Sequence, residues 1–107
     1  MRNRQFERVK LASQTAIKTG NHCFNALTKD LSLSGMLIHT DHHIPVGKRV
    51  SISLNLPSVS RSSPVTLDGI VVRNTVHSVA FEFKSLDYET FCYLKAILHR
   101  KTKYYSD

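Results

Sequence analysis

A two-residue alternation in the middle of the chain limits most strongly what the sequence can fold into. From Val50 to Leu56, every second residue is valine, isoleucine or leucine, the residues between them are polar, and Pro57 follows. Period two places successive side chains on opposite faces of a strand, so one face is buried and the other is wet. Val79, Phe81 and Phe83 alternate in the same way and are expected in the core.

Turn signals divide the first part of the chain into short strands. Gly20-Asn21 predicts a turn because both residues tolerate positive φ, and Ile44–Gly47 predicts another. Gly69 interrupts a regular strand, which indicates a bulge or a close approach by another group. The expected strands cover residues 9–18, 22–28, 36–40, 50–56, 65–73 and 79–83.

The period changes near the C-terminus, where a helix is expected from Asp87 to about Lys101. The Asp87 carboxylate can accept N–H bonds from the first helical turn. Leu86 and Phe91 hold the positions of a hydrophobic staple. The apolar stripe at helical spacing consists of Phe91, Leu94, Ile97 and Leu98.

These elements predict a mainly β fold, a six-stranded antiparallel β-barrel with a C-terminal α-helix. Closing a small sheet into a barrel removes its exposed edges. The length of 107 residues suits a single domain. We expect a flexible basic arm at residues 1–8, the barrel at 9–85 and the helix at 86–103.

The two cysteines, Cys23 and Cys92, lack CxxC spacing and do not predict a disulfide framework. One falls in a strand and the other on the apolar helix face, so both are expected to be small buried hydrophobes. The N-terminus lacks the apolar run of a signal peptide, and no apolar stretch reaches the ~18 residues of a membrane span. The sequence therefore predicts a cytoplasmic protein without membrane insertion.

A net charge of +7 favours anionic partners, although solvated termini that keep the protein soluble explain it equally well. Arg4 and Arg8 stand four residues apart in the basic N-terminal segment. A guanidinium is a planar fork of donors that pairs with phosphate and with the O6/N7 edge of guanine. Alone, this RxxxR pair is a weak signal.

The stretch Asp30-Leu31-Ser32-Leu33-Ser34-Gly35 is a second polar motif. The Asp30 carboxylate could accept guanine N1–H and N2–H or brace an arginine, and the Ser32 hydroxyl can donate or accept. Gly35 permits backbone angles that a Cβ would block. Taken singly, such a motif is more often a capped turn between strands.

Together, RxxxR before the first strand and DxSxxG ahead of a later strand resemble the signature of the PilZ family. The run from Gly69 to Arg73 also resembles the GxVxR strand of that family. The resemblance covers residues 4–100 and implies one PilZ domain with the barrel and helix described above. Asn3 departs from members that carry a further arginine there, so one bound ligand or a stacked pair stays open.

This resemblance implies a receptor for the bacterial second messenger cyclic di-GMP. The two arginines would grip phosphates and guanine O6/N7, while Asp30 and Ser32 would hold guanine's polar edge. Gly69 would let a base lie close to the barrel wall, and Arg73 is either a ligand contact or a solvated strand residue. The implied ligand-binding residues are Arg4, Arg8, Asp30, Ser32, Gly35, Gly69 and Arg73.

The family further implies a signalling role without catalysis or a resident cofactor. Ligand binding would order the arm, and the surface so formed would pass the signal to a partner protein of unknown identity. Whether the chain is a monomer or a homodimer stays open. The main alternative is a PilZ-like interaction adaptor that binds no nucleotide.

Two other kinds of binding are less well supported by the sequence. Specific nucleic-acid binding would need a basic face bearing aromatic residues, and the basic residues lie mostly at the ends. His39, His42 and His43 lie close together around Asp41, but they lack a fourth metal ligand at a fixed spacing. Ordinary surface histidines are therefore expected here. No nucleophile–base pair marks an active site.

Overall fold

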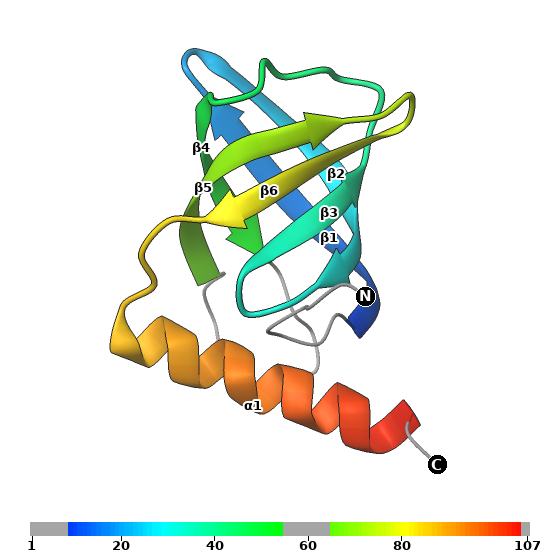
Figure 1. Ribbon diagram of the computed structural model, residues 1–107, viewed down its shortest axis with the longest axis vertical. Coiled ribbons are helices and arrows are strands. Elements are labelled where there is room, and N and C mark those ends of the chain that lie inside the picture. The colour runs from blue at the N-terminus through cyan, green and yellow to red at the C-terminus, as the bar shows by residue number, and fades with distance from the viewer. Residues whose placement is uncertain (1–8, 55–64, 106–107) are drawn as a thin grey trace, which may run out of the picture.

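Six antiparallel strands close into a barrel, and one helix lies across an end of it (Figure 1). The computed structural model describes residues 9–54 and 65–105, so the expected arm at 1–8 lies outside the described ranges. Around the barrel the strands follow the order β1-β2-β3-β6-β5-β4. The elements are β1 (Val9–Thr19), β2 (His22–Leu31), β3 (Gly35–His39), β4 (Arg49–Leu54), β5 (Val65–Asn74), β6 (Ser78–Phe83) and α1 (Tyr88–Tyr105). The predicted fold class is confirmed.

Within the described ranges, the alternating segments form strands whose apolar side chains fill the barrel, as predicted, while the last two residues of the expected strand 50–56 lie outside those ranges. On β4, Val50, Ile52 and Leu54 are buried, while the serines between them are half-buried. On β6, Val79 and Phe81 are buried, and Phe83 packs against the core from its edge. Burying such side chains stabilises the fold by about 1.5–3 kcal/mol each.

The turn between β1 and β2 has the expected position, but only one of its two central residues has a positive φ. Thr19 and His22 are paired across two turn residues, and Gly20 has a φ of 59°. Among the described residues, positive φ is confined to Gly20 and Gly47, so Asn21 does not use it. A glycine in the first central position is typical of the type II′ turn, whose twist suits a β-hairpin.

The Asp87 cap predicted for the helix is present. Its Oδ1 accepts the Thr90 backbone N–H at 2.7 Å, so α1 begins at Tyr88 rather than at 86. The helix packs on the core through Leu94, Ile97 and Leu98, which are buried.

Phe91, the first residue of the predicted helix stripe, is less buried than the other three. Its ring is half-buried and lies 5.9 Å from the Lys95 ammonium. Tyr93 packs against the core.

Both cysteines are exposed, which contradicts the prediction that they are buried. On β2 the even-numbered residues Phe24 and Thr28 face inward, so Cys23 faces outward. Cys92 precedes the buried Leu94 by two positions, which is more than half a helical turn. Among the described helices, none is both long and apolar enough to cross a membrane.

Candidate functional site

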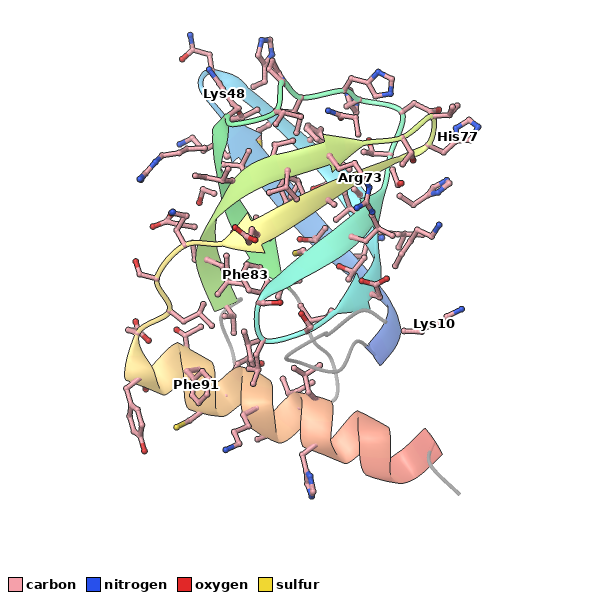
Figure 2. The ribbon with its side chains drawn as sticks, viewed as in Figure 1. Lys10, Lys48, Arg73, His77, Phe83 and Phe91 are labelled. Atoms are coloured by element: carbon pink, nitrogen blue, oxygen red, sulfur yellow. The ribbon has the colours of Figure 1, made fainter. Side chains whose placement is uncertain are left out.

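A row of directly paired residues crosses five strands on the outside of the barrel. Asp30 is paired with Lys10 on β1 and with Leu37 on β3. Leu37 is paired with Ala80, which is paired with Arg73 on β5. We call these five residues the outer row; Figure 2 shows Lys10 and Arg73 on the outside of the barrel. The row brings together two predicted site residues that are far apart in the sequence.

Two bulges turn Asp30 and Arg73 toward the outer face. On β2, Thr28 pairs with Ile38 but Asp30 pairs with Leu37, so Lys29 is an extra residue. If β2 had no bulge here, strict alternation from the buried Thr28 would direct the Asp30 side chain into the core.

Strand β5 contains a second bulge of the same kind. Val71, which is fully buried, pairs with Phe81, whereas Arg73 pairs with Ala80, so Val72 is the extra residue. The bulge lies three residues after Gly69 rather than at Gly69. Each bulge directly precedes a charged residue of the outer row, and bulges commonly redirect side chains in this way.

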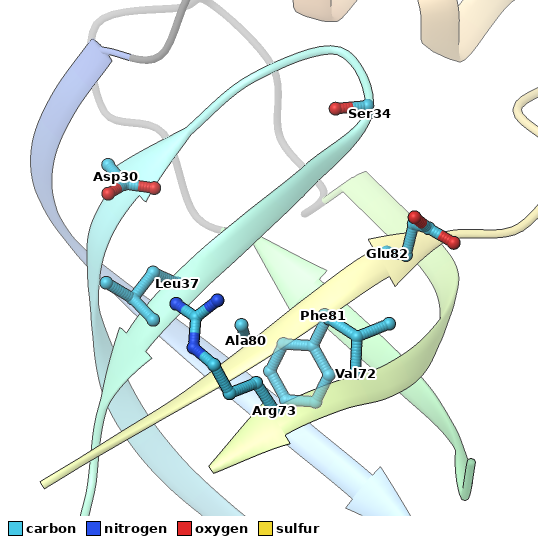
Figure 3. A pocket seen from close by; sticks show the side chains of 8 residues that line it. All are labelled: Asp30, Ser34, Leu37, Val72, Arg73, Ala80, Phe81 and Glu82. Atoms are coloured by element: carbon cyan, nitrogen blue, oxygen red, sulfur yellow. The ribbon is translucent and has the colours of Figure 1, made fainter. Parts of the chain in front are cut away.

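A depression of about 220 Å³ lies over the middle of the outer row. Figure 3 shows the Arg73 guanidinium reaching over Ala80 toward Leu37, with Asp30 beyond. Leu37 and Ala80 form an apolar floor between a carboxylate and a guanidinium. Since adjacent strands are ~4.8 Å apart, the path from Asp30 to Arg73 along the curved sheet spans three strand spacings, or ~14 Å. The lining residues are Asp30, Ser34, Leu37, Val72, Arg73, Ala80, Phe81 and Glu82.

The Ser32 side chain is fully buried and builds the turn between β2 and β3. Its Oγ accepts the backbone N–H groups of Ser34 at 3.1 Å and Gly35 at 3.2 Å. The hydroxyl hydrogen has acceptors in Gly35 O at 3.3 Å and Ser34 Oγ at 3.1 Å. A hydroxyl has one donor and two acceptor sites, so these bonds use its capacity. The structure therefore shows that Ser32 forms this turn, and the direct ligand contact expected from the sequence stays a prediction.

Ser34 is the site residue that sequence reasoning missed. It is exposed and lines the depression, while its backbone carbonyl accepts the Phe83 N–H at 2.8 Å. The second serine of the motif was the available signal, but only the geometry of the turn distinguishes the two.

Gly35 is required for a steric reason rather than for its backbone angles. Its φ is not in the positive region, but an added Cβ would collide with the Phe81 carbonyl oxygen on β6. This close approach holds the β2–β3 turn against β6 and fixes the edge of the depression.

Gly69 lies on the inner side of the barrel wall. An added Cβ would lie 3.0 Å from Ile52 Cδ1 and 3.6 Å from Phe81 Cβ. The predicted close approach is thus made by the Ile52 side chain. Gly69 does not line the depression, so the structure does not bring it together with Asp30 and Arg73. Arg4 and Arg8 lie outside the described residues.

The histidine cluster forms a separate polar network. Asp41 Oδ1 is 2.7 Å from His77 Nδ1, and this hydrogen bond lowers the pKa of the Asp41 carboxyl. His42 stacks on Phe24 with ring centroids 4.2 Å apart. Within the described part of the chain, no group of three His, Cys, Asp or Glu residues could hold a metal ion.

Comparison with known proteins identifies both a family and a fold. The family model described as the PilZ domain matches residues 2–100. A search of curated proteins gave no significant match. Three solved structures of similar fold are described next, each less than 20% identical to this chain.

The Bacillus subtilis inhibitor of motility, MotI/DgrA, has a TM-score of 0.86 and 15% identity; all of this chain aligns with 55% of that protein. The PilZ domain of YcgR from Escherichia coli, solved with c-di-GMP, has a TM-score of 0.77 and 17% identity, with 96% and 94% of the chains covered. The K. pneumonia MrkH–c-di-GMP complex has a TM-score of 0.76 and 14% identity, with 94% and 52% covered. The chain thus spans about half the length of two of these proteins.

Proposed function

Because the chain belongs to the PilZ domain family, we propose that it is a receptor for cyclic di-GMP that binds this ligand over the outer row. The observation that carries the proposal is the pairing of Asp30, Leu37, Ala80 and Arg73 across four strands. Two of the similar structures, YcgR and MrkH, contain c-di-GMP. Receptor function requires binding rather than catalysis, so the protein is not an enzyme in this proposal.

The chemistry of the depression matches the chemistry of the ligand. Cyclic di-GMP offers two guanine rings and two phosphates. A ring lying over Ala80 would bury apolar surface mainly of Leu37, which is half-buried, since Ala80 is already buried. Asp30 would accept guanine N1–H and N2–H, and Arg73 would donate to a phosphate or to guanine O6/N7. In this role Ser34 supplies an exposed hydroxyl, while Ser32 and Gly35 act by shaping the turn.

Arg4 and Arg8 are proposed to supply the remaining positive charge. Chain connectivity supports this role for Arg8, because it directly precedes Val9 and consecutive Cα atoms are ~3.8 Å apart. Val9 is paired with Leu31, the neighbour of Asp30. Arg8 therefore directly precedes, in the sequence, a strand residue that is paired next to Asp30.

We further propose that ligand binding orders the N-terminal segment and that the resulting surface engages a partner protein in the cytoplasm. A ligand shifts such an equilibrium only through different affinities for the two states. Contacts from Arg4 and Arg8 would provide that difference.

Calorimetric titration with cyclic di-GMP tests the proposal, with GMP and cyclic di-AMP as comparison ligands. Selective, saturable binding is expected, and its molar ratio distinguishes one ligand from a stacked pair. Arg8→Ala and Asp30→Ala should each weaken binding about tenfold or more, since a hydrogen bond to a charged group contributes ~1.5–3 kcal/mol.

Lys84→Ala is the matched control, because Lys84 is exposed and does not line the depression. Its affinity should equal that of the wild type. Absence of cyclic di-GMP binding by the folded wild-type protein would contradict the receptor function and favour the nucleotide-independent adaptor.

A further inference from the structure

Histidines gather at the end of the barrel opposite the helix. Of the six in the sequence, His22 follows the β1–β2 turn, His39 ends β3, His42 and His43 lie in the next loop, and His77 lies in the β5–β6 turn. Figure 2 shows His77 and Lys48 at this end, far from α1. The outer-row depression does not use these residues.

A cleft of about 580 Å³ opens at this end, between the tip of the β1–β2 hairpin and the loop that precedes β4. His22, His42, His43 and Lys48 line it, and none of the described lining residues is acidic. The nearby Asp41 carboxylate is engaged by His77 at 2.7 Å. No carboxylate is among the described lining residues, so the cleft presents imidazole and ammonium groups, and the Asp41 carboxylate outside the lining also interacts electrostatically with His42.

One wall of the cleft is aromatic. Phe24 and His42 both line it, and their rings are stacked with an interplanar angle of 27°. Ile44 is buried at its base. Such a wall suits a planar ring on the ligand, since aromatic pairs contribute ~0.5–1.5 kcal/mol beyond the area that they bury.

The loop that carries these residues is held in place by hydrogen bonds. The Asn74 side chain bonds to both the backbone N–H and the carbonyl of Ile44, at 3.2 and 2.8 Å. Thr40 N–H donates to His77 O at 2.9 Å and Gly47 N–H to Val71 O at 2.8 Å.

One lining imidazole is itself oriented by this network. His43 Nε2 lies 3.0 Å from the Thr75 carbonyl oxygen. Because a carbonyl only accepts, Nε2 carries the hydrogen. This bond orients the His43 ring on the wall of the cleft.

We propose that this cleft is a second ligand site, which takes a small molecule bearing both a phosphate group and a planar ring. Lys48 and the imidazoles of His22 and His42 are the phosphate donors, and the Phe24–His42 pair is the ring wall. Phosphate oxygens accept charge-assisted hydrogen bonds from an ammonium group and ordinary hydrogen bonds from imidazole N–H groups. The site is independent of the proposed cyclic di-GMP site.

Amide chemical-shift titration of the full chain with phenyl phosphate tests the proposal. Saturable shifts are expected at residues 19–24 and 42–48. Phenyl phosphate should bind at least about threefold more tightly than inorganic phosphate, because the ring adds an aromatic contact. Equal affinities, or shifts scattered over all exposed lysines, would overturn the proposal.

Variants separate the charge from the ring. Lys48→Met should weaken binding about fivefold or more, whereas Lys48→Arg should retain it within about twofold. His42→Ala should remove the preference for phenyl phosphate over inorganic phosphate. The amide spectrum itself reports whether each variant is folded, and unchanged binding by Lys48→Met would overturn the site.

Two control variants test whether phenyl phosphate binds in this cleft rather than at the outer row. Lys84→Met removes an exposed lysine elsewhere and should leave the affinity for phenyl phosphate unchanged. Arg73→Ala, which removes the proposed phosphate contact of the outer row, should also bind phenyl phosphate like the wild type. Loss of phenyl phosphate binding in Arg73→Ala would assign the signal to the outer row and overturn a separate site.

Discussion

The fully buried Ser32 hydroxyl accepts the Gly35 backbone N–H at 3.2 Å. Ser32→Ala would leave two N–H groups, those of Ser34 and Gly35, without this acceptor. An unsatisfied buried donor costs ~1–3 kcal/mol, so we expect the melting temperature to fall by several degrees. Thermal unfolding followed by circular dichroism measures this loss.

Ser34→Ala is the matched control for that prediction, because Ser34 is exposed and its backbone N–H keeps the Ser32 acceptor. Its melting temperature should remain close to that of the wild type. Equal destabilisation by both substitutions would contradict the distinct role assigned to Ser32.

Gly35→Ala should destabilise the protein more than Gly69→Ala does. The Cβ at position 35 would collide with a backbone atom, the Phe81 carbonyl oxygen, so β3 and β6 must separate. At position 69 the nearest atom is Ile52 Cδ1, the end of a flexible side chain, at 3.0 Å. Overpacking costs ~1–3 kcal/mol. We expect Gly35→Ala to lower the free energy of unfolding by ~3 kcal/mol or more. Urea unfolding of both variants gives the comparison, and the reverse order would refute it.

The alternation in β4 and β6 was sufficient to predict strands with one buried face, because period two depends only on the order of apolar residues. The barrel was inferred from the removal of exposed sheet edges and from the resemblance to the PilZ family. The outward orientation of Asp30 and Arg73 was not predictable in that way. From Val71, strict alternation directs Arg73 into the core, and only the register shift after Val71 reverses it. A bulge arises from pairing with another strand, so its position is not encoded in the local pattern.

The functions of Ser32 and Ser34 illustrate the same limit at the candidate site. Both are serines with the same chemistry, and only the tertiary turn buries one and exposes the other. The exposure of Cys23 likewise depends on which residues of β2 face inward. The hydrophobicity of the residues alone did not show that Cys23 faces outward.

Arg73→Ala tests the part of the proposed cyclic di-GMP site that the outer row contributes. Arg73 is exposed on β5 and lines the depression, so its removal should leave stability within ~0.5 kcal/mol. Loss of its charged hydrogen bonds should weaken cyclic di-GMP binding about tenfold or more. Calorimetry on Arg73→Ala beside Arg49→Ala, an exposed arginine that does not line the depression, makes the comparison. Equal affinities in the two variants would exclude Arg73 from the ligand contacts.

The Asp87 cap predicts how stability responds to acid. The Thr90 backbone N–H donates to the Asp87 carboxylate, and this bond lowers the pKa of Asp87 from its ordinary value of 3.8. A lowered folded-state pKa means that the stabilisation is fully present above the unfolded-state value and is lost as the pH falls through the folded one. Asp87→Asn retains a capping oxygen but cannot titrate. The melting temperature of the wild type minus that of Asp87→Asn should therefore be constant from about pH 5 to 7. Below about pH 4 this difference should decrease, because the wild type loses the stabilisation that the Asp87 charge provides. A difference that is unchanged down to pH 2 would show that the Asp87 charge does not stabilise α1.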